Sequence, residues 1–408
     1  MKAVDERVDA MRSPSVPSRA AATYDVRRHN VAALLRALLK EGPAPRVDLA
    51  ERLSMSSGTT TRITAELTRA GLLQELPALT SGDAGRPRVP LDLASARFHA
   101  VGIHVGLRRT TVGLVDLRGR PVGDKIRIPH GGELDPATVV GEAAERVAGL
   151  VPTTSAQIIG TGFTTVGRVD AASGRIRDHD MLGWTDVDIP ALAAGRFPGL
   201  LVVDATQRAL CRAEMWFGVD PGVRDFVHLY IGNVIGAGIV IDRELHHGQN
   251  EGAGHIAHLP LSRPAQLPCE CGRGGCLMSV AGDRAIISRA LREGVLTEER
   301  SVHDLAERAR RGDSLADYLL RDRARAIGEA VAIVHDLLAP DQIIVFGTPL
   351  LVPDHITEIR REARRWMRRD FDADQLIKPS TLDDDAPVVA AATCVLERFY
   401  ADPFALIG

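Results

Sequence analysis

The sequence predicts an α/β body of two lobes that follows an all-α head with a small β-wing. In the head, three apolar helical stripes lie between residues 25 and 71, and two short alternating stretches follow them. After residue 95, strand-like and helix-like segments alternate, and a strand-rich start occurs twice, which is typical of layered α/β lobes. The length of 408 residues also favours two or three domains over one.

Composition and charge exclude several classes of protein. Hydrophobic residues make up 45% and charged residues 25% of the chain, as in soluble globular proteins. No apolar run approaches the roughly 20 residues of a membrane helix, and residues 1–22 lack the apolar segment of a secretory signal. Residues 1–90 carry 14 Lys and Arg against 10 Asp and Glu, a mild basic excess that alone decides little. We expect a cytoplasmic protein with no membrane association.

The head is predicted to span residues 23–94, after a Ser- and Pro-containing flexible arm at 1–22. Its first helix begins at Asp25 and ends before residues 42–45, and a short helix follows at 46–53. Residues 54–57 form a serine-rich turn that caps a third helix, which ends at Gly71. Helix, short helix, turn and helix is a helix-turn-helix arrangement.

Two parts of this head carry side chains suited to DNA. The exposed face of the third helix presents small hydroxyls and one arginine, which can reach phosphates and base edges. The stretches 72–76 and 89–93 predict a two-stranded wing, whose Gly-Arg-Pro-Arg loop suits a narrow minor groove. The predicted contacts to double-stranded DNA are therefore Ser57, Thr59, Thr61, Arg62, Arg86 and Arg88. A three-helix interaction domain with a charged hairpin is the alternative.

The body is predicted as repeated strand and helix units. Three strands at 100–106, 110–116 and 122–128 precede a helix at 135–150 and a strand at 157–161. The pattern restarts with a strand at 200–204, a helix to 217, and strands at 226–231 and 236–242. The remaining segments are helices and one strand, at 279–293, 302–311, 315–338, 342–346 (the strand), 354–369 and 386–400. The duplicated start fits the actin-like, ribonuclease H-like fold.

One short segment has the composition of a metal site. His258 is followed by Cys269, Cys271 and Cys276, and three thiolates with one imidazole are the ligand set of a closed, tetrahedral structural Zn²⁺ site. Gly272, Gly274 and Gly275 allow the tight turns that such a loop needs. Buried thiols or a redox pair are the alternatives, although a cytosolic chain seldom keeps disulfides.

The order of these motifs resembles the ROK family (repressors, open reading frames and sugar kinases). The resemblance rests on the glycine-rich strand pair at 229–242, the His-Gly-x-Asn of 247–250, the Ala-Gly-x-Ile-x-His of 253–258, and the cysteines. The head resembles that of the repressor branch (NagC/Mlc/XylR-like), with counterparts at 50–53, 59–67, 70–72 and in the Gly-Arg-Pro wing. The resemblance implies a DNA-binding transcriptional regulator, with repression as the expected effect.

Kinase chemistry is not expected, because the residues it needs are replaced. The family's kinases use an Asp-x-Gly-Gly-Thr loop for phosphate and magnesium. His104 stands at the Asp position, Leu107 at the second Gly and Arg108 at the Thr. Thr348 replaces one of the paired glycines beside adenosine. We therefore predict a protein that is not an enzyme and has no catalytic residue.

The resemblance also implies an effector site. Asp204 is the counterpart of the catalytic base and is expected to hydrogen-bond an effector, with a strand-end cap as the alternative. The expected ligand-binding residues are Asp204, Asn250, His255 and His258, converging on one pocket. His255 and Met278 each replace a glutamate, so the effector class stays broad: a sugar, an amino sugar or a sugar phosphate.

The implied organisation is a sensor and oligomerisation body at 95–408, with a zinc loop at 258–276. A homodimer or homotetramer would pair heads on a pseudo-palindromic operator. Two alternatives are an active sugar kinase, and a regulator whose vestigial ligand site is controlled by a protein partner.

Overall fold

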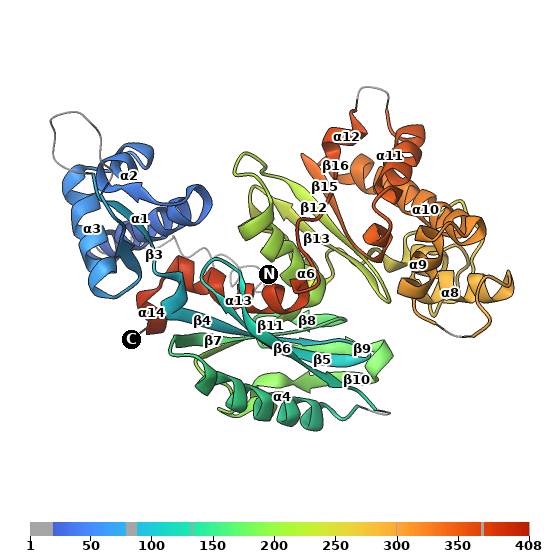
Figure 1. The fold of residues 1–408 in the computed structure, drawn as a ribbon, viewed down its shortest axis with the longest axis horizontal. Coiled ribbons are helices and arrows are strands. Elements are labelled where there is room, and N and C mark those ends of the chain that lie inside the picture. The colour runs from blue at the N-terminus through green and yellow to red at the C-terminus, as the bar shows by residue number, and fades with distance from the viewer. Residues whose placement is uncertain (1–18, 79–87, 132–133, 299, 369–370, 408) are drawn as a thin grey trace, which may run out of the picture. The chain divides into compact units, whose positions relative to one another are not determined.

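The computed structural model describes residues 19–78, 88–131, 134–298, 300–368 and 371–407, and these form two compact units. The first unit comprises the described residues up to Ala94 together with those from Glu397 onward, and the second comprises 95–396. Figure 1 shows the elements of each unit. Within the described residues, no helix has the length and apolar character needed to cross a membrane.

The first unit packs three helices against a small antiparallel sheet. The helices are α1 (Arg19–Glu41), α2 (Arg46–Arg52) and α3 (Ser57–Arg69). The sheet has the order β1-β3-β2, with β1 at Ala44–Pro45, β2 at Leu73–Glu75 and β3 at Pro90–Leu93. Leu73 pairs with Leu93, so the two strands predicted for the wing do pair. Helix α1 begins six residues earlier than predicted; residues 19–22, assigned to the arm, are helical, because three of them are alanine.

The C-terminal residues also belong to this unit, whereas the sequence assigned them to the body. Helix α13 (Ala386–Ala401) ends here, and α14 (Phe404–Ile407) follows. The Tyr24 hydroxyl donates to the Asp402 carboxylate at 2.7 Å, and the Arg27 guanidinium lies 5.3 Å from the centroid of the Phe404 ring. These long-range contacts attach the C-terminus to α1.

The first lobe of the second unit is built on a five-stranded sheet with the order β11-β7-β4-β5-β6. The strands are β4 (Phe98–Val105), β5 (Arg109–Asp116), β6 (Pro121–Pro129), β7 (Gln157–Thr165) and β11 (Leu200–Ala205). Helices α4 (Pro136–Leu150) and α5 (Ile189–Ala193) share its apolar core. Helix α13 approaches the sheet at glycines: a Cβ at Gly162 would lie 1.7 Å from the Ala391 carbonyl oxygen. Only glycine therefore permits this contact.

The second lobe repeats the arrangement with the order β14-β13-β12-β15-β16. Its strands are β12 (Phe226–Ile231), β13 (Ile235–Ile241), β14 (Glu244–Leu245), β15 (Gln342–Gly347) and β16 (Ile377–Pro379). Its helices are α6 (Thr206–Ala213), α7 (Leu277–Ala281), α8 (Asp283–Arg292), α9 (Val302–Arg310), α10 (Ser314–Leu338), α11 (His355–Trp366) and α12 (Ala373–Leu376). The helix predicted at 279–293 is thus two helices, separated at Gly282, and the one predicted at 354–369 ends at Trp366.

A third, small sheet was not predicted. It has the order β10-β9-β8, with β8 at Arg168–Asp170, β9 at Arg175–His179 and β10 at Trp184–Asp188. Its strands are rich in Arg and Asp, and ion pairs such as Arg175–Asp188 join β9 to β10. Such short, charged strands lack the apolar alternation by which strands are recognised.

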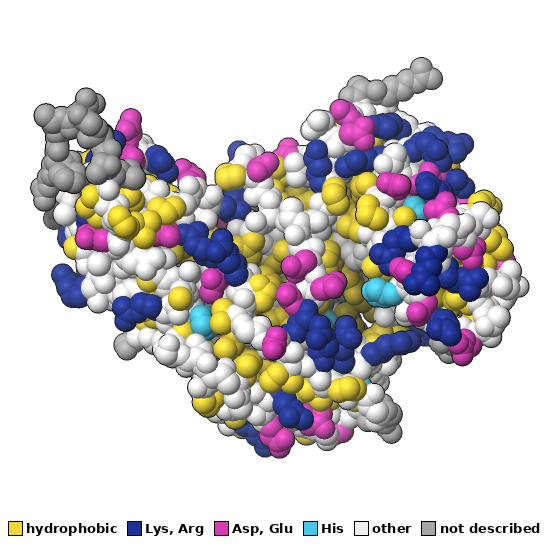
Figure 2. All heavy atoms as spheres, viewed as in Figure 1, with side chains coloured by type: hydrophobic (Ala, Val, Ile, Leu, Met, Phe, Trp, Pro, Cys, Tyr) yellow, Lys and Arg dark blue, Asp and Glu magenta, His cyan; other side chains and the backbone are white. Residues whose placement is uncertain are grey.

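On the face shown in Figure 2, the second lobe carries many basic side chains, and acidic side chains lie among them. On α11, Arg361 pairs with Glu358, and Arg365 pairs with Glu362 at 3.3 Å. This mixture of charges is typical of a solvated face, and it does not make a continuous basic surface for DNA.

Candidate functional site

The histidine and three cysteines predicted as metal ligands lie together. The ligand atoms of His258, Cys269, Cys271 and Cys276 are all within 4.8 Å of one another. His258 Nδ1 is 3.2 Å from Cys269 Sγ, and Cys271 Sγ is 3.4 Å from Cys276 Sγ. In a tetrahedral zinc site with Zn–S bonds near 2.3 Å, sulfurs are about 3.8 Å apart. The spacing and the donor set therefore fit a single ion of this kind.

The backbone brings the two ends of this loop together. Pro260 forms an isolated antiparallel bridge with Cys276, and the Leu261 N–H donates to the Gly275 carbonyl at 2.8 Å. Gly272 and Gly275 both have φ of 75°, the left-handed conformation that glycine adopts without strain, whereas Gly274 is not among the positive-φ residues. Cys276 is buried and directly precedes α7, so the cluster fixes the start of that helix.

An arginine inside the loop anchors it to the lobe. Arg263 donates to Glu329 at 3.2 Å, to Asp322 at 3.2 Å and to Glu362 at 3.1 Å. The Ser262 N–H donates to the other oxygen of Glu329 at 2.6 Å. These carboxylates come from α10 and α11, far away in the sequence. Sequence reasoning missed this residue, because its role is visible only once its partners are placed.

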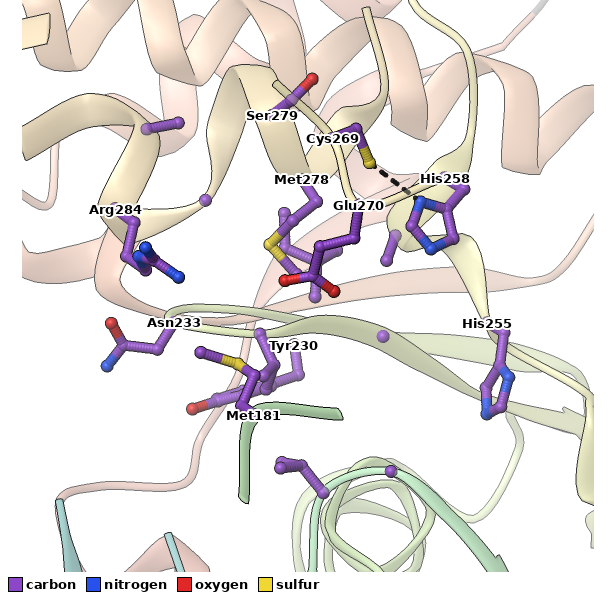
Figure 3. Close-up of a pocket in the computed structure, with 18 of the residues that line it drawn as sticks. Met181, Tyr230, Asn233, His255, His258, Cys269, Glu270, Met278, Ser279 and Arg284 are labelled. Atoms are coloured by element: carbon purple, nitrogen blue, oxygen red, sulfur yellow. Dashed lines mark hydrogen bonds between the residues drawn. The ribbon is translucent and has the colours of Figure 1, made fainter. Parts of the chain in front are cut away.

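A cavity of about 760 Å³ lies beside the cluster, entirely within the second unit. Its walls come from the β9–β10 turn, the β12–β13 hairpin, the metal-cluster loop and the start of α8. Figure 3 shows Met181, Tyr230, Met278 and Arg284 around it, with His255 on one side. This volume is in the range of pockets that bind small molecules, roughly 300–1,000 Å³.

The four residues expected to converge on one pocket do not all do so. His255 and His258 line the cavity, whereas Asp204 and Asn250 are not among the described residues that line it. Asn250 is exposed, in the short turn Gln249–Glu251, with a left-handed φ of 52°. Asp204 is only 1% exposed. This cavity therefore includes two of the four residues, and the ligand-binding roles of all four stay a prediction.

The carboxylate of Asp204 is buried and is paired with two arginines. Its carboxylate accepts hydrogen bonds from Arg208 Nε at 2.7 Å, from Arg212 Nη1 at 2.9 Å and from the Ala205 N–H at 2.7 Å. Burial alone raises the pKa of Asp204, but the charges of Arg212 and Arg208 outweigh it and hold the pKa below its ordinary value. Asp204 is thus an ionised internal partner of two arginines.

Arg208 extends this network to the loop that carries Asn250. Its guanidinium pairs with Glu251 at 2.9 Å and donates to the Val169 carbonyl at 2.6 Å. His247 Nδ1 lies 2.8 Å from the same Glu251 carboxylate. Part of the signal was present in the sequence, because Arg208 and Arg212 are four residues apart on α6 and so share a helical face, which follows directly after Asp204 at the end of β11.

The positions where a kinase would bind ATP are also altered. Burial, with the charges of Arg109 and His179, lowers the pKa of His104 to about 4, so its ring is neutral at pH 7 and adds no negative charge for magnesium. The Thr348 hydroxyl donates to Asp283 at 2.6 Å, and Arg323 donates to Thr348 at 2.9 Å and to Asp283 at 2.7 Å. Arg323 is 2% exposed. The surroundings of Thr348 are therefore filled by paired side chains.

In the head, α3 presents most of its predicted DNA contacts to solvent. Ser57, Thr61 and Arg62 are exposed, and Thr59 is half-buried because its hydroxyl accepts a hydrogen bond from Ser56 at 2.9 Å. The Ser56 oxygen also caps the helix, accepting from the Thr59 N–H at 3.1 Å. Arg88 is exposed and lies 3.5 Å from Asp48. Arg86 falls outside the described residues.

Comparisons with known proteins also distinguish a DNA-binding head from a body of another family. The model of the ROK family matches residues 100–398, and that of the winged helix-turn-helix DNA-binding domain matches residues 30–74. A transcriptional regulator of Mycobacterium bovis is 30% identical over 393 residues, which cover 91% of this chain and 86% of the relative. An N-acetylglucosamine repressor of Escherichia coli is 26% identical over 79% of this chain and 81% of its own length.

Solved structures show the same fold. A ROK family transcriptional regulator, described as a homologue of an Escherichia coli protein, superposes with a TM-score of 0.77 at 23% identity and covers 92% of this chain and 97% of its own. A ROK family glucokinase of Streptomyces griseus, solved with glucose and AMPPNP, has a TM-score of 0.61 at 24% identity. The superposed region covers 98% of the glucokinase but 72% of this chain.

Proposed function

The chain belongs to the ROK family, and on that premise we propose that it is a repressor whose DNA affinity is controlled by a carbohydrate-type effector in the cavity beside the metal cluster. The protein is a DNA-binding transcriptional regulator with a winged helix-turn-helix head and two α/β lobes of the sugar-kinase fold. Its near-full-length relatives are regulators, not kinases.

Two features of the body support regulation without phosphoryl transfer. The side chain at the magnesium position, His104, is neutral, and the residue at the catalytic-base position, Asp204, is held by two arginines. A base must be able to reach a substrate hydroxyl, and Asp204 is enclosed. The fold is thus retained for binding.

The proposed DNA contacts are Ser57, Thr59, Thr61 and Arg62 on α3, with Arg86 and Arg88 in the wing. The exposure of Ser57, Thr61 and Arg62 supports this assignment for α3. One head covers a half-site, so we expect a homodimer or homotetramer on a pseudo-palindromic operator.

The metal cluster is proposed to hold a structural zinc ion. Four protein ligands fill a tetrahedral shell and leave no position for a substrate. When bound, the ion supplies a crosslink between the last residue of η6 (Ile256–His258) and the start of α7. His258 lies in both the cluster and the cavity wall, so the order of the loop and the shape of the cavity depend on each other.

The observation that carries the proposal is that residues of both lobes line the cavity. A ligand alters DNA affinity only if it binds two arrangements of the protein with different affinity. The cavity is lined by both α/β lobes, so a ligand that contacts both favours one arrangement of them. His255, which stands on the cavity side, is the proposed selector of the sugar.

The test is a selection of DNA fragments by the purified full chain, with and without a panel of sugars, amino sugars and sugar phosphates. We expect an enriched pseudo-palindromic sequence that is released by at least one member of the panel. Enrichment that no member changes, together with no binding by calorimetry, would favour a vestigial site controlled by a protein partner. Turnover of ATP with a hexose would reinstate the kinase alternative.

A further inference from the structure

We propose that the cavity takes a carbohydrate that carries a neutral, apolar aryl substituent, and that Met181, Tyr230 and Met278 contact this substituent. The proposal rests on the carbohydrate effector proposed above and narrows its class.

Three side chains give part of the cavity wall an apolar character. Met181 stands in the turn between β9 and β10 and is 37% exposed. Met278 is partly buried on α7 and packs on the core of the second lobe, and Tyr230 comes from β12, where its ring lies 5.9 Å from that of Phe346. Figure 3 shows all three around the same space. Thioethers adapt their shape and contact aromatic rings favourably, so this wall suits a flat apolar group.

Polar side chains also line the cavity: in Figure 3, Glu270 lies beside Met278, and Asn233 and Arg284 lie on the side opposite His255. His255 is on one side of the view in Figure 3, away from Met181 and Met278. Arg168 and Asp178 also line the cavity, and they are paired with each other. These groups can serve some sugar hydroxyls, but Asp204, which would have accepted another, already accepts three hydrogen bonds.

Size and charge narrow the ligand further. A cavity of about 760 Å³ is much larger than one hexose, so a monosaccharide alone leaves the wall at Met181 and Met278 uncovered. Glu270 is exposed and lies beside Met278 in Figure 3. Its carboxylate disfavours a negative charge at this point of the ligand. Arg168 and Arg284 line other parts of the cavity, so this argument applies only beside Glu270. The substituent that fits against Met181 and Met278 is therefore apolar and neutral.

Matched pairs of glycosides test this directly. Calorimetry of the full chain would compare methyl with 4-nitrophenyl β-D-glucopyranoside, with the same pairs of the N-acetylglucosaminide and the xylopyranoside, and with glucose 6-phosphate. In at least one pair we expect the aryl glycoside to bind about tenfold more tightly than the methyl glycoside, since an aryl ring buries a large apolar area.

Two variants test whether the methionines of the cavity wall cause the tighter binding of aryl glycosides. Met181→Ala removes apolar area, and Met278→Gln keeps the length of the side chain while making it polar; both should reduce the ratio of the two dissociation constants. Leu315→Ala is the matched control. The exposed fraction of Leu315, 40%, is similar to the 37% of Met181, but Leu315 is not among the described residues that line the cavity. Melting temperature and metal content would establish that each variant is folded.

The outcomes separate this inference from the proposed function. Equal affinity within every pair, or an unchanged ratio in both methionine variants, overturns the apolar contact while a bound sugar upholds the carbohydrate effector. Tighter binding of glucose 6-phosphate than of every aryl glycoside overturns it in the same way. If free 4-nitrophenol binds as tightly as its glycosides, the apolar contact stands and the carbohydrate effector fails. No binding across the panel overturns both.

Discussion

Replacing Asp204 by Asn is expected to destabilise the body of the protein, not to uncouple an effector from DNA. The carboxylate is 1% exposed and neutralises two buried arginines. An amide of the same size keeps the packing but leaves Arg208 with Glu251 as its acidic partner, and Arg212 without the negative charge of Asp204. Breaking a buried pair from one side costs roughly 3–5 kcal/mol.

This magnitude is measurable by calorimetry of unfolding. A change of 1 kcal/mol shifts the melting temperature by about 2–4 °C in domains of 150–250 residues and by less in larger ones. We therefore expect the body to melt roughly 5–10 °C lower in Asp204→Asn. Asp242→Asn is the control: its side chain is 72% exposed and pairs with Arg224 at the surface, so it should melt like the wild type.

The same pair of proteins has a defined pH dependence. The pKa of Asp204 is lower in the folded state than its ordinary value of 3.8, so its stabilising contribution is complete above that value and is lost as the pH falls through the folded-state pKa. The difference in melting temperature should be constant from pH 8 to about pH 5 and should shrink below about pH 4. A variant within about 1 °C of the wild type at pH 7 would refute the reasoning. It would also return Asp204 to the role that the family resemblance implied, as a hydrogen-bond partner of the effector.

Three further predictions concern the head, the cluster and the C-terminus. Arg62→Ala should weaken operator binding and reduce the slope of log affinity against log salt concentration by about 0.9 if Arg62 contacts one phosphate. Arg69→Ala, at the other end of α3, should change neither the affinity nor the slope. An equal loss of affinity in both variants would contradict the recognition face assigned to α3. Cys269→Ser should lower the zinc content well below one ion per chain and reduce thermal stability. Cys394 is a buried cysteine outside the cluster, so Cys394→Ser should keep the metal. Full zinc occupancy in Cys269→Ser would contradict the proposed ligand set. Phe404→Ala should increase hydrogen exchange in α1, because it removes a ring that lies 5.3 Å from Arg27; unchanged exchange would show that the C-terminal contact does not stabilise the head.

The sequence predicts the head and the metal cluster closely, because local rules determine both. The serine-rich turn does cap α3, and Gly71 has a φ of 74° next to the residue that ends the helix. In the cluster, cysteine spacing and two left-handed glycines suffice to bring the ligand atoms together. Contacts between residues near in sequence are therefore recovered from sequence.

The candidate site is predicted less well, because its chemistry depends on pairs that are distant in sequence. Arg263 and Glu362 are 99 residues apart, and Arg212 and Cys394 are 182 apart. The small sheet β8–β10 was missed because its strands are charged, and it supplies Arg168 and Asp178 to the cavity. The resemblance to kinases implies a role for Asp204, but it does not reveal that Arg208 and Arg212 donate hydrogen bonds to its carboxylate in the folded chain.

Arginine is the common element in the two departures from kinase geometry. At Asp204, Arg208 and Arg212 take the acceptor capacity that a base would offer a substrate hydroxyl. At Thr348, Arg323 joins a hydroxyl and a carboxylate beside the former adenosine position. Restoring a carboxylate at His104 alone would thus leave both positions filled, and no ATP turnover is expected from that single change. His255 and Met278, at positions where the family resemblance implies glutamates, both line the cavity. Specificity in this protein should therefore change most readily at those two positions, with the arginine pairs left intact.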